Sequence, residues 1–146
     1  MHILIVHQVF VTPNEGGGTR HFEIAKYLVK FGHAVTVIAS DTDYLSGKKK
    51  AMSFEVIDGV NIYYVKTLSS LHKSIFTRGL SFFSFMYSCY KKGISIKGVD
   101  LVWGTSPPLF QVLAAYRIAK VNKIPIVCEV RDLWQNQAKD LSLHTQ

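Results

Sequence analysis

Apolar and polar positions alternate along the chain in blocks that predict strands and helices in turn. Residues 2–7 form an Ile- and Val-rich run, typical of a central strand buried on both faces. Residues 17–31 then carry apolar side chains at helical spacing, and Gly32 is the expected stop signal. The predicted apolar face consists of Phe22, Ala25, Leu28, Val29 and Phe31. Because residues 34–39 read as a second strand, the opening predicts a right-handed, parallel βαβ unit.

The rest of the chain continues the alternation. After a polar loop, Asp58-Gly59 lies between two β-rich runs and predicts a hairpin. The later predicted elements are a helix at 74–92, a strand at 100–103, a helix ending near Asn122 and capped by Thr105-Ser106-Pro107-Pro108, and a buried strand at 124–130. No closing element is evident from Arg131 onward. The fold class predicted is therefore α/β: a Rossmann-like, mainly parallel sheet with helices on both faces.

Composition narrows the class of protein. The 146 residues are 48% hydrophobic and 18% charged, which predicts one globular domain with its own core. No apolar run reaches the ~18 residues needed to cross a bilayer, and the N-terminal run lacks a basic leader. Cys89 and Cys128 show no pairing or metal pattern, so we expect buried, reduced thiols in a cytosolic protein.

The net charge of +7 bears on partners rather than on fold. It is compatible with nucleic acid, an anionic membrane surface or phosphorylated small molecules, but no nucleic-acid motif is present, so we expect no nucleic-acid partner. The basic run Lys48-Lys49-Lys50 is expected in a solvated loop. Residues 71–92 mix aromatic and basic side chains; packing onto the sheet is the favoured interpretation, and contact with an anionic bilayer is the alternative.

Three loops follow the carboxyl ends of predicted parallel strands and are expected to meet at one edge, where α/β sheets bind ligands. They contain Gly16-Gly17-Gly18-Thr19-Arg20, Gly104-Thr105-Ser106-Pro107-Pro108, and Glu129-Val130-Arg131-Asp132. Each Gly costs about 0.5–1 kcal/mol relative to Ala, so three in succession indicate a difficult turn or a close approach to the backbone. The loop ends where a helix begins, which favours an anion, but it is neither a G-x-G-x-x-G fingerprint nor a P-loop.

Candidate chemistry at this edge is limited. Asp132 is the best candidate acid or base, with helix capping as the equal alternative. Ser106 is interpreted as a helix cap rather than a nucleophile, His7 as a structural residue facing the site, and Glu129 as a partner for a backbone or basic group. Asp41 stands where a dinucleotide-binding acid would, but the long preceding loop favours an ordinary loop residue. The six histidines lack ligand spacing, so no metal is expected. No cofactor is expected either.

Several of these motifs together carry a resemblance. Ile3-Leu-Ile-Val-His-Gln, Gly16-Gly-Gly-Thr-Arg, Gly32-His-Ala-Val-Thr-Val-Ile, Asp58-Gly-Val-Asn-Ile-Tyr, Thr105-Ser-Pro-Pro-Leu and Glu129-Val-Arg-Asp-Leu-Trp occur in this order. The set resembles the start of retaining group 1 glycosyltransferases (glycosyltransferase family four), especially members that build bacterial surface polysaccharides. The match covers nearly the whole chain, and it depends on the order of the motifs rather than on any one.

The resemblance implies half of a GT-B enzyme. Residues 1–146 would form the N-terminal, acceptor-side domain, and the donor-binding domain with its pair of glutamates is absent from this sequence. Implied partners are a nucleotide-sugar donor and a saccharide or lipid-linked saccharide acceptor at the cytoplasmic face; peripheral attachment to the inner face of the plasma membrane stays open. Gly16, Gly17 and Gly18 would lie at the cleft floor near the donor, and Asp132 near the reacting sugar. The isolated chain is expected to be inactive.

Three other classes of protein remain as alternatives. The first is a free-standing module that binds a nucleotide or sugar without turning it over. The second is a dinucleotide-dependent reductase, against which the absent fingerprint argues. The third is a receiver-type signalling domain, which needs acidic residues at the end of the first strand, where this chain has His7-Gln8.

Overall fold

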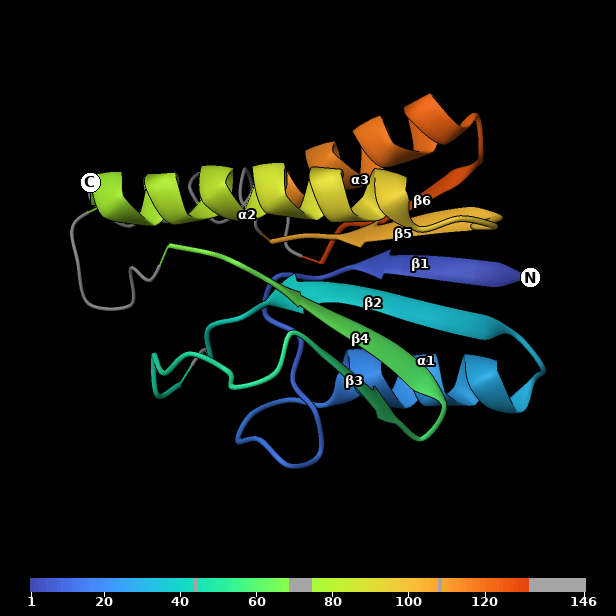
Figure 1. Ribbon diagram of the computed structural model, residues 1–146, viewed down its shortest axis with the longest axis horizontal. Helices are drawn as coiled ribbons and strands as arrows, with labels where there is room; N and C mark the ends of the chain where they lie inside the picture. Colours follow the sequence, from blue (N-terminus) through green and yellow to red (C-terminus); the bar gives the residue numbers. More distant parts are fainter. Residues whose placement is uncertain (44, 69–74, 108, 132–146) are drawn as a thin grey trace, which may run out of the picture.

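The computed structural model describes residues 1–43, 45–68, 75–107 and 109–131, with residues 75–78 described through their backbone alone. The strands are β1 (His2–Val6), β2 (Ala34–Ser40), β3 (Phe54–Ile57), β4 (Val60–Val65), β5 (Leu101–Thr105) and β6 (Ile126–Glu129). The helices are α1 (Arg20–Lys30), α2 (Ile75–Ser95) and α3 (Leu109–Asn122). Figure 1 shows the strands as one twisted sheet between these helices.

The sheet has the strand order β3-β4-β2-β1-β5-β6, and every neighbouring pair is parallel except β3 with β4. From β1 the chain first builds outward through β2 and β4, and it then returns to the other side of β1 to add β5 and β6. The strand order therefore reverses between β1 and β5. In open α/β sheets this reversal leaves a crevice at the carboxyl ends of the two strands, where ligands bind.

Helices cover both faces of the sheet, which accounts for the buried, β-branched central strands. On one face, Phe22 and Ala25 of α1 pack against β1, β2 and β4. On the other, α2 and α3 lie side by side, and Phe85 and Cys89 of α2 pack with Ile118 of α3 (Figure 1). The predicted mixed α/β fold with a mainly parallel sheet is thus confirmed.

Two local signals in the sequence correctly set element boundaries. At the end of α1, the N–H of Gly32 (φ +83°) donates to the Val29 carbonyl and that of His33 to the Leu28 carbonyl, which is a Schellman motif. At the β3–β4 turn, both Asp58 and Gly59 have positive φ (49° and 81°), as a two-residue type I′ hairpin requires. Each boundary depends on a residue that tolerates the left-handed region.

Some expectations about burial and boundaries are wrong. The strand predicted as buried at 124–130 is the shorter β6, where Val127 and Cys128 are exposed, so only Cys89 is a buried thiol. Phe31 does not join the apolar face of α1. It is the C-cap residue and is 67% exposed, because it follows Phe22 by about two and a half turns and so lies on the opposite side of the helix, beside the exposed Tyr27.

The basic run at 48–50 is less solvated than expected. Of the three lysines, only Lys48 is exposed without a carboxylate partner among the described residues. Lys49 Nζ lies 2.6 Å from an Asp41 carboxylate oxygen, and the largely buried Lys50 pairs with Glu15. Asp41 is therefore a structural loop residue, as expected, which also accepts a hydrogen bond from the Thr67 N–H.

Candidate functional site

The end of β6 is fixed to the start of α1 by one carboxylate. Glu129, the last residue of β6, accepts from Arg20 Nη2 at 2.7 Å and lies 2.9 Å from His21 Nε2. Burial alone raises the pKa of Glu129, but the hydrogen bonds from His21 and Thr105 and the charges of His21 and Arg20 outweigh it, so the pKa is lowered. The carboxylate is therefore ionised at neutral pH and pairs with the two residues that open α1.

Buried aromatic rings lie behind this contact. The rings of His7, directly after β1, and His21 are 4.2 Å apart between centroids, and Trp103 of β5 lies 5.7 Å from His21. Burial, together with the charges of His21 and Arg131, lowers the pKa of His7 to about 3 against the opposing effect of Glu129. His7 is thus a neutral imidazole, which suits the expected structural role.

Gln111 of α3 joins the ends of β1 and β5. Its Oε1 accepts from the Gln8 N–H at 2.6 Å, and its Nε2 donates to the Thr105 carbonyl and to the Pro107 carbonyl at 3.0 Å. The side chain is fully buried. Every polar atom of this amide is therefore used to hold the two backbone segments that border the β1/β5 crevice.

The loop after β5 departs from its predicted role. Thr105 is the last residue of β5, α3 begins only at Leu109, and the Ser106–Pro107 peptide bond is cis. Ser106 Oγ accepts from the Arg131 N–H at 3.3 Å, and the Ser106 N–H donates to the Glu129 carbonyl at 2.9 Å. The expectation that Thr105 and Ser106 cap α3 is therefore wrong; they join β5 to the end of β6.

The glycine loop is an exposed feature at the same edge. Gly16, Gly17 and Gly18 are all exposed, Thr19 is the N-cap of α1 without a side-chain capping bond, and Arg20 opens the helix. A Cβ at Gly16 would approach the Leu45 side chain to 3.0 Å, and Gly17 has φ +131°, whereas a Cβ at Gly18 would meet nothing within 4 Å. The turn thus accounts for Gly16 and Gly17, but internal packing gives no reason for Gly18.

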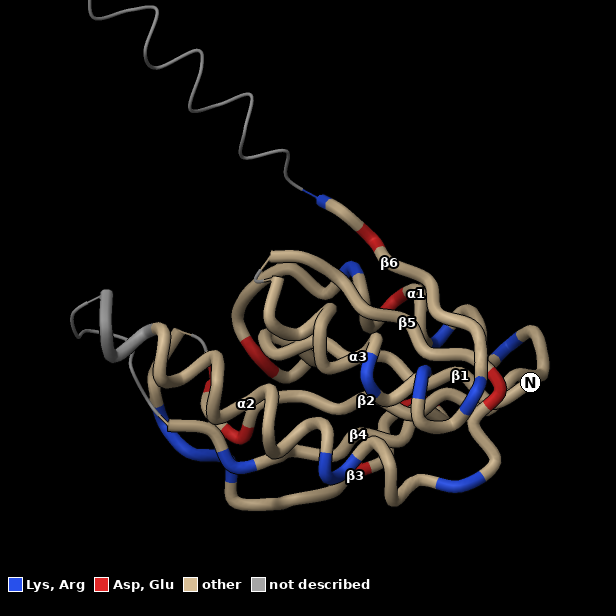
Figure 2. The backbone as a smooth tube through the Cα atoms, turned by 90° about the horizontal axis from the view of Figure 1, so that it is seen from above, with Lys and Arg blue, Asp and Glu red and all other residues tan. Residues whose placement is uncertain are grey.

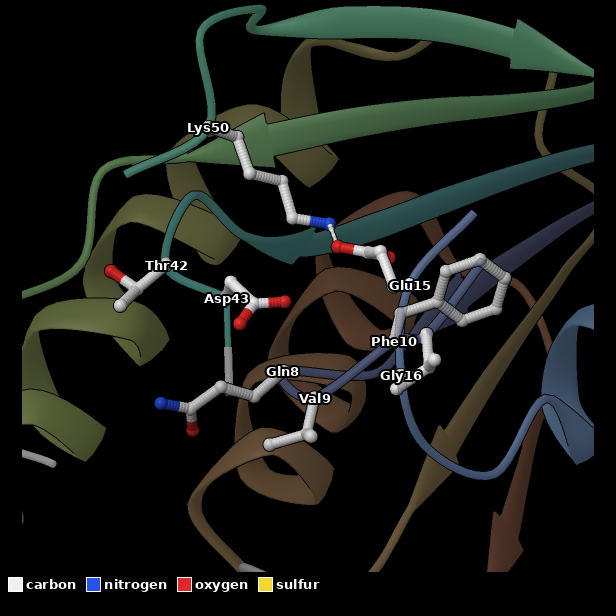
Figure 3. A pocket seen from close by; sticks show the side chains of 9 residues that line it. Gln8, Val9, Phe10, Glu15, Gly16, Thr42, Asp43 and Lys50 are labelled. Carbon is white, nitrogen blue, oxygen red and sulfur yellow. Dashed lines mark ion pairs between the residues drawn. The ribbon is translucent and has the colours of Figure 1, made fainter. Parts of the chain in front are cut away.

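A shallow hollow adjoins this loop. Figure 3 shows it between the segment after β1, with Gln8 and Phe10, and the loop after β2, with Thr42 and Asp43. The Glu15–Lys50 ion pair borders it, and Glu15 also accepts from the Thr12 N–H at 2.9 Å. The space that it encloses is about 10 Å³. Sites for drug-sized ligands measure roughly 300–1,000 Å³, so this hollow is far too small to enclose a nucleotide sugar.

The sequence-predicted residues thus fall into three groups. Those brought together around the β1/β5 crevice are His7, Arg20, Thr105, Ser106, Glu129 and Arg131. Gly16, Gly17, Gly18 and Thr19 precede α1 on the exposed loop. Asp132, the candidate acid or base, lies outside the described residues. Within the described ranges, no group of three or more His, Cys, Asp and Glu residues is arranged to hold a metal ion.

Three residues at this edge were not singled out from the sequence: His21, Trp103 and Gln111. A signal did exist for two of them. His21 stands four residues before Ala25 on the buried stripe of α1, and Gln111 stands with Ala114, Ala115 and Ile118 on that of α3. A polar residue on an otherwise apolar helical stripe must find partners inside the protein. That rule would have marked both positions.

Comparison with known proteins informs the fold alone. No family model matches the chain, and no curated protein matches it. Among solved structures, the C-terminal domain of a hydrogenase from Pyrococcus furiosus is similar, with a TM-score of 0.57 and 14% identity, covering 88% of this chain and 89% of that one. At such low identity the likeness supports the α/β architecture and carries no information about ligand or reaction.

Proposed function

We propose that this chain is the acceptor-side domain of a retaining glycosyltransferase of the GT-B type, which moves a sugar from a nucleotide-sugar donor to a saccharide acceptor, most simply a lipid-linked one. The observation that carries the proposal is the position of the motifs that resemble the family. Four of the six, which end at Gln8 or contain Gly16, Thr105 or Glu129, lie at or after the carboxyl ends of β1, β5 and β6, around the point where the strand order reverses. The other two, which begin at Gly32 and Asp58, precede β2 and β4 at the opposite edge of the sheet.

The geometry of this edge supports binding rather than complete catalysis. Sugar transfer from a nucleotide donor needs a water-excluding cleft and charge stabilisation at the leaving phosphate. Here Glu129 already occupies Arg20 and His21 as their partner, and the hollow beside Gly16 is too small to enclose the donor. A second domain would supply the opposite wall of the cleft, so the 146-residue chain alone is expected to transfer no sugar.

Gly18 offers a sharp test because a side chain there meets nothing within the domain. In the protein purified from its source cells, Gly18→Val should preserve folding and yet reduce sugar transfer at least tenfold, since the new side chain blocks the approach of the donor. Asn14→Val, on an exposed position of the same loop, is the matched control. Transfer is measured from radiolabelled nucleotide sugars to an extract of the cell's own lipids.

Native size, measured with an antibody raised against this chain, completes the test. The proposal expects a species two to three times larger than 16.5 kDa that transfers sugar. A species of the chain's own size without transfer activity would overturn it. In that case a nucleotide-sugar titration would decide whether the edge acts as a simple binding module.

A further inference from the structure

The outward faces of α2 and α3 carry the same succession of side chains. Each presents two apolar residues, then a tyrosine, then a lysine, at spacings of three or four residues that keep them on one helical face. The exposed residues are Leu80, Phe83, Tyr87 and Lys91 in α2, and Leu109, Leu113, Tyr116 and Lys120 in α3. In each helix the lysine lies over the ring of its own tyrosine, with Nζ 5.7 Å and 5.9 Å from the centroids. We call these eight residues the paired stripes.

The two helices align the stripes with each other. They run in the same direction side by side on one face of the sheet (Figure 1). The ring of Phe83, in the middle of α2, lies 4.9 Å from that of Phe110 at the start of α3, and further along both helices Gly93 lies directly against Ile118. The apolar halves of the stripes are therefore neighbours, and so are the basic halves. Together they form one exposed surface, and exposed apolar side chains that lie together beside polar ones are typical of an interaction site.

Charge on this layer has a single sign. The sequence contains no Asp or Glu from residue 59 to 99, and none from 101 to 128. Lys91, Arg117 and Lys120 are exposed, and within the described ranges they take part in none of the ion pairs. In contrast, Lys26, Lys49 and Lys50, elsewhere on the molecule, each have a carboxylate partner. Figure 2 shows the distribution of basic and acidic positions as seen from above this layer.

We propose that the paired stripes dock on the surface of an anionic lipid bilayer. No described helix is long and apolar enough to cross a membrane, so the helices lie along the surface. All eight side chains then face the bilayer. Leu80, Phe83, Leu109 and Leu113 insert at the acyl boundary, the tyrosines lie at the headgroup level, and the long lysine side chains reach up to anionic headgroups. Side chains of these three kinds on one helical face are typical of a helix that lies in the plane of a membrane interface. All the charged side chains on this surface are basic, which suits the diffuse negative charge of an anionic bilayer.

The inference is independent of the proposed function, because it concerns a face made of helices rather than the carboxyl edge of the sheet. Its test uses the 146-residue chain and vesicles of phosphatidylcholine alone or with 30% phosphatidylglycerol. The chain should float with the anionic vesicles, at least tenfold more than with the neutral ones, and should lose most of this binding in 0.5 M salt. In the Tyr87→Trp variant, the fluorescence emission of the new tryptophan should shift to the blue when the chain binds the vesicles.

Matched variants separate the paired stripes from general charge and general hydrophobicity. Lys91→Glu with Lys120→Glu should lower the partition coefficient at least tenfold, whereas Lys30→Glu with Lys48→Glu, which changes net charge equally at exposed positions elsewhere, should lower it less than threefold. Phe83→Ser with Leu113→Ser should abolish binding, and Tyr27→Ser with Phe31→Ser, on α1, should not. All eight positions substituted in these four double variants are exposed, so circular dichroism should show every variant folded.

Two outcomes would overturn the proposal. Equal losses in the stripe and control variants would mean that net charge alone attracts the chain to lipid. Absence of binding to anionic vesicles by the folded chain would assign the surface to a protein partner instead.

Discussion

Nε2 of His21 lies 2.9 Å from Oε2 of Glu129, although 108 residues separate the two in the sequence. The contact joins the first turn of α1 to the last residue of β6. It spans the point between β1 and β5 where the strand order reverses. The candidate site is therefore braced by a contact between the first helix and the last described strand.

Glu129→Ala should destabilise the fold by about 1–3 kcal/mol, because the buried His21 imidazole would lose its partner. Arg20→Ala removes the other cation from the same carboxylate, but the Arg20 side chain is 60% exposed, so the cost should stay below about 1 kcal/mol. Urea unfolding followed by circular dichroism measures both. Equal losses would mean that the two contacts contribute alike and that burial of His21 is unimportant.

Acid should destabilise the protein through His7. Its pKa is about 3 in the folded state and 6.5 in the unfolded chain, so between these values the unfolded state binds the extra proton. The free energy of unfolding should therefore fall as pH falls below 6.5, by up to about 1.4 kcal/mol per pH unit from this group. Glu129 adds its own loss only below pH 4.5, because its folded pKa is lowered from that value.

His7→Gln isolates the histidine contribution. Between pH 6.5 and 5 the variant should show a flatter dependence of unfolding free energy on pH than the wild type, whatever its absolute stability. Urea titrations at three pH values in this window suffice. If the two slopes agree, His7 does not remain neutral in the folded protein.

Gly104→Ala should destabilise the protein by about 1–3 kcal/mol, since a Cβ there would lie 2.8 Å from the Ala115 Cβ and 3.3 Å from the Val112 Cα. These atoms belong to α3 and cannot rotate away. Gly18→Ala is the control, with no atom within 4 Å of its Cβ and an expected change within about 0.5 kcal/mol. Thermal or urea unfolding of both variants gives the comparison, and similar stabilities would show that α3 can move away from β5.

The two cysteines should differ in reactivity. Cys128 is exposed, whereas Cys89 is fully buried and its burial raises the thiol pKa. Titration with a chromogenic disulfide reagent should therefore modify one thiol rapidly in the native protein and two in denaturant. Cys128→Ser should remove the rapid phase, and persistence of that phase in the variant would place Cys89 within reach of solvent.

The sequence predicts those parts of the fold that depend on neighbouring residues. The end of α1 follows from Gly32, and the β3–β4 hairpin from Asp58-Gly59, because only a few residue types tolerate positive φ. The strand blocks follow from runs of β-branched residues, which suit a sheet covered on both faces. Their order along the chain then limits the topology to a few arrangements.

The remaining features depend on contacts that periodicity does not encode. A run such as 124–130 has the same composition whether it becomes a central strand or an edge strand. Val127 and Cys128 are exposed because β6 is at the edge of the described sheet. The pairing of Glu129 with His21 requires both the strand order and the helix orientation. Asp132 stays a prediction from sequence.

The three hydrogen bonds of the Gln111 amide have a mechanical consequence. They connect α3 to the backbone at the ends of both β1 and β5. A force that slides α3 along its axis must either break these bonds or pull the rim of the crevice with it. A push on the outer surface of α3 is thus transmitted, through one side chain, to the backbone at the ends of β1 and β5.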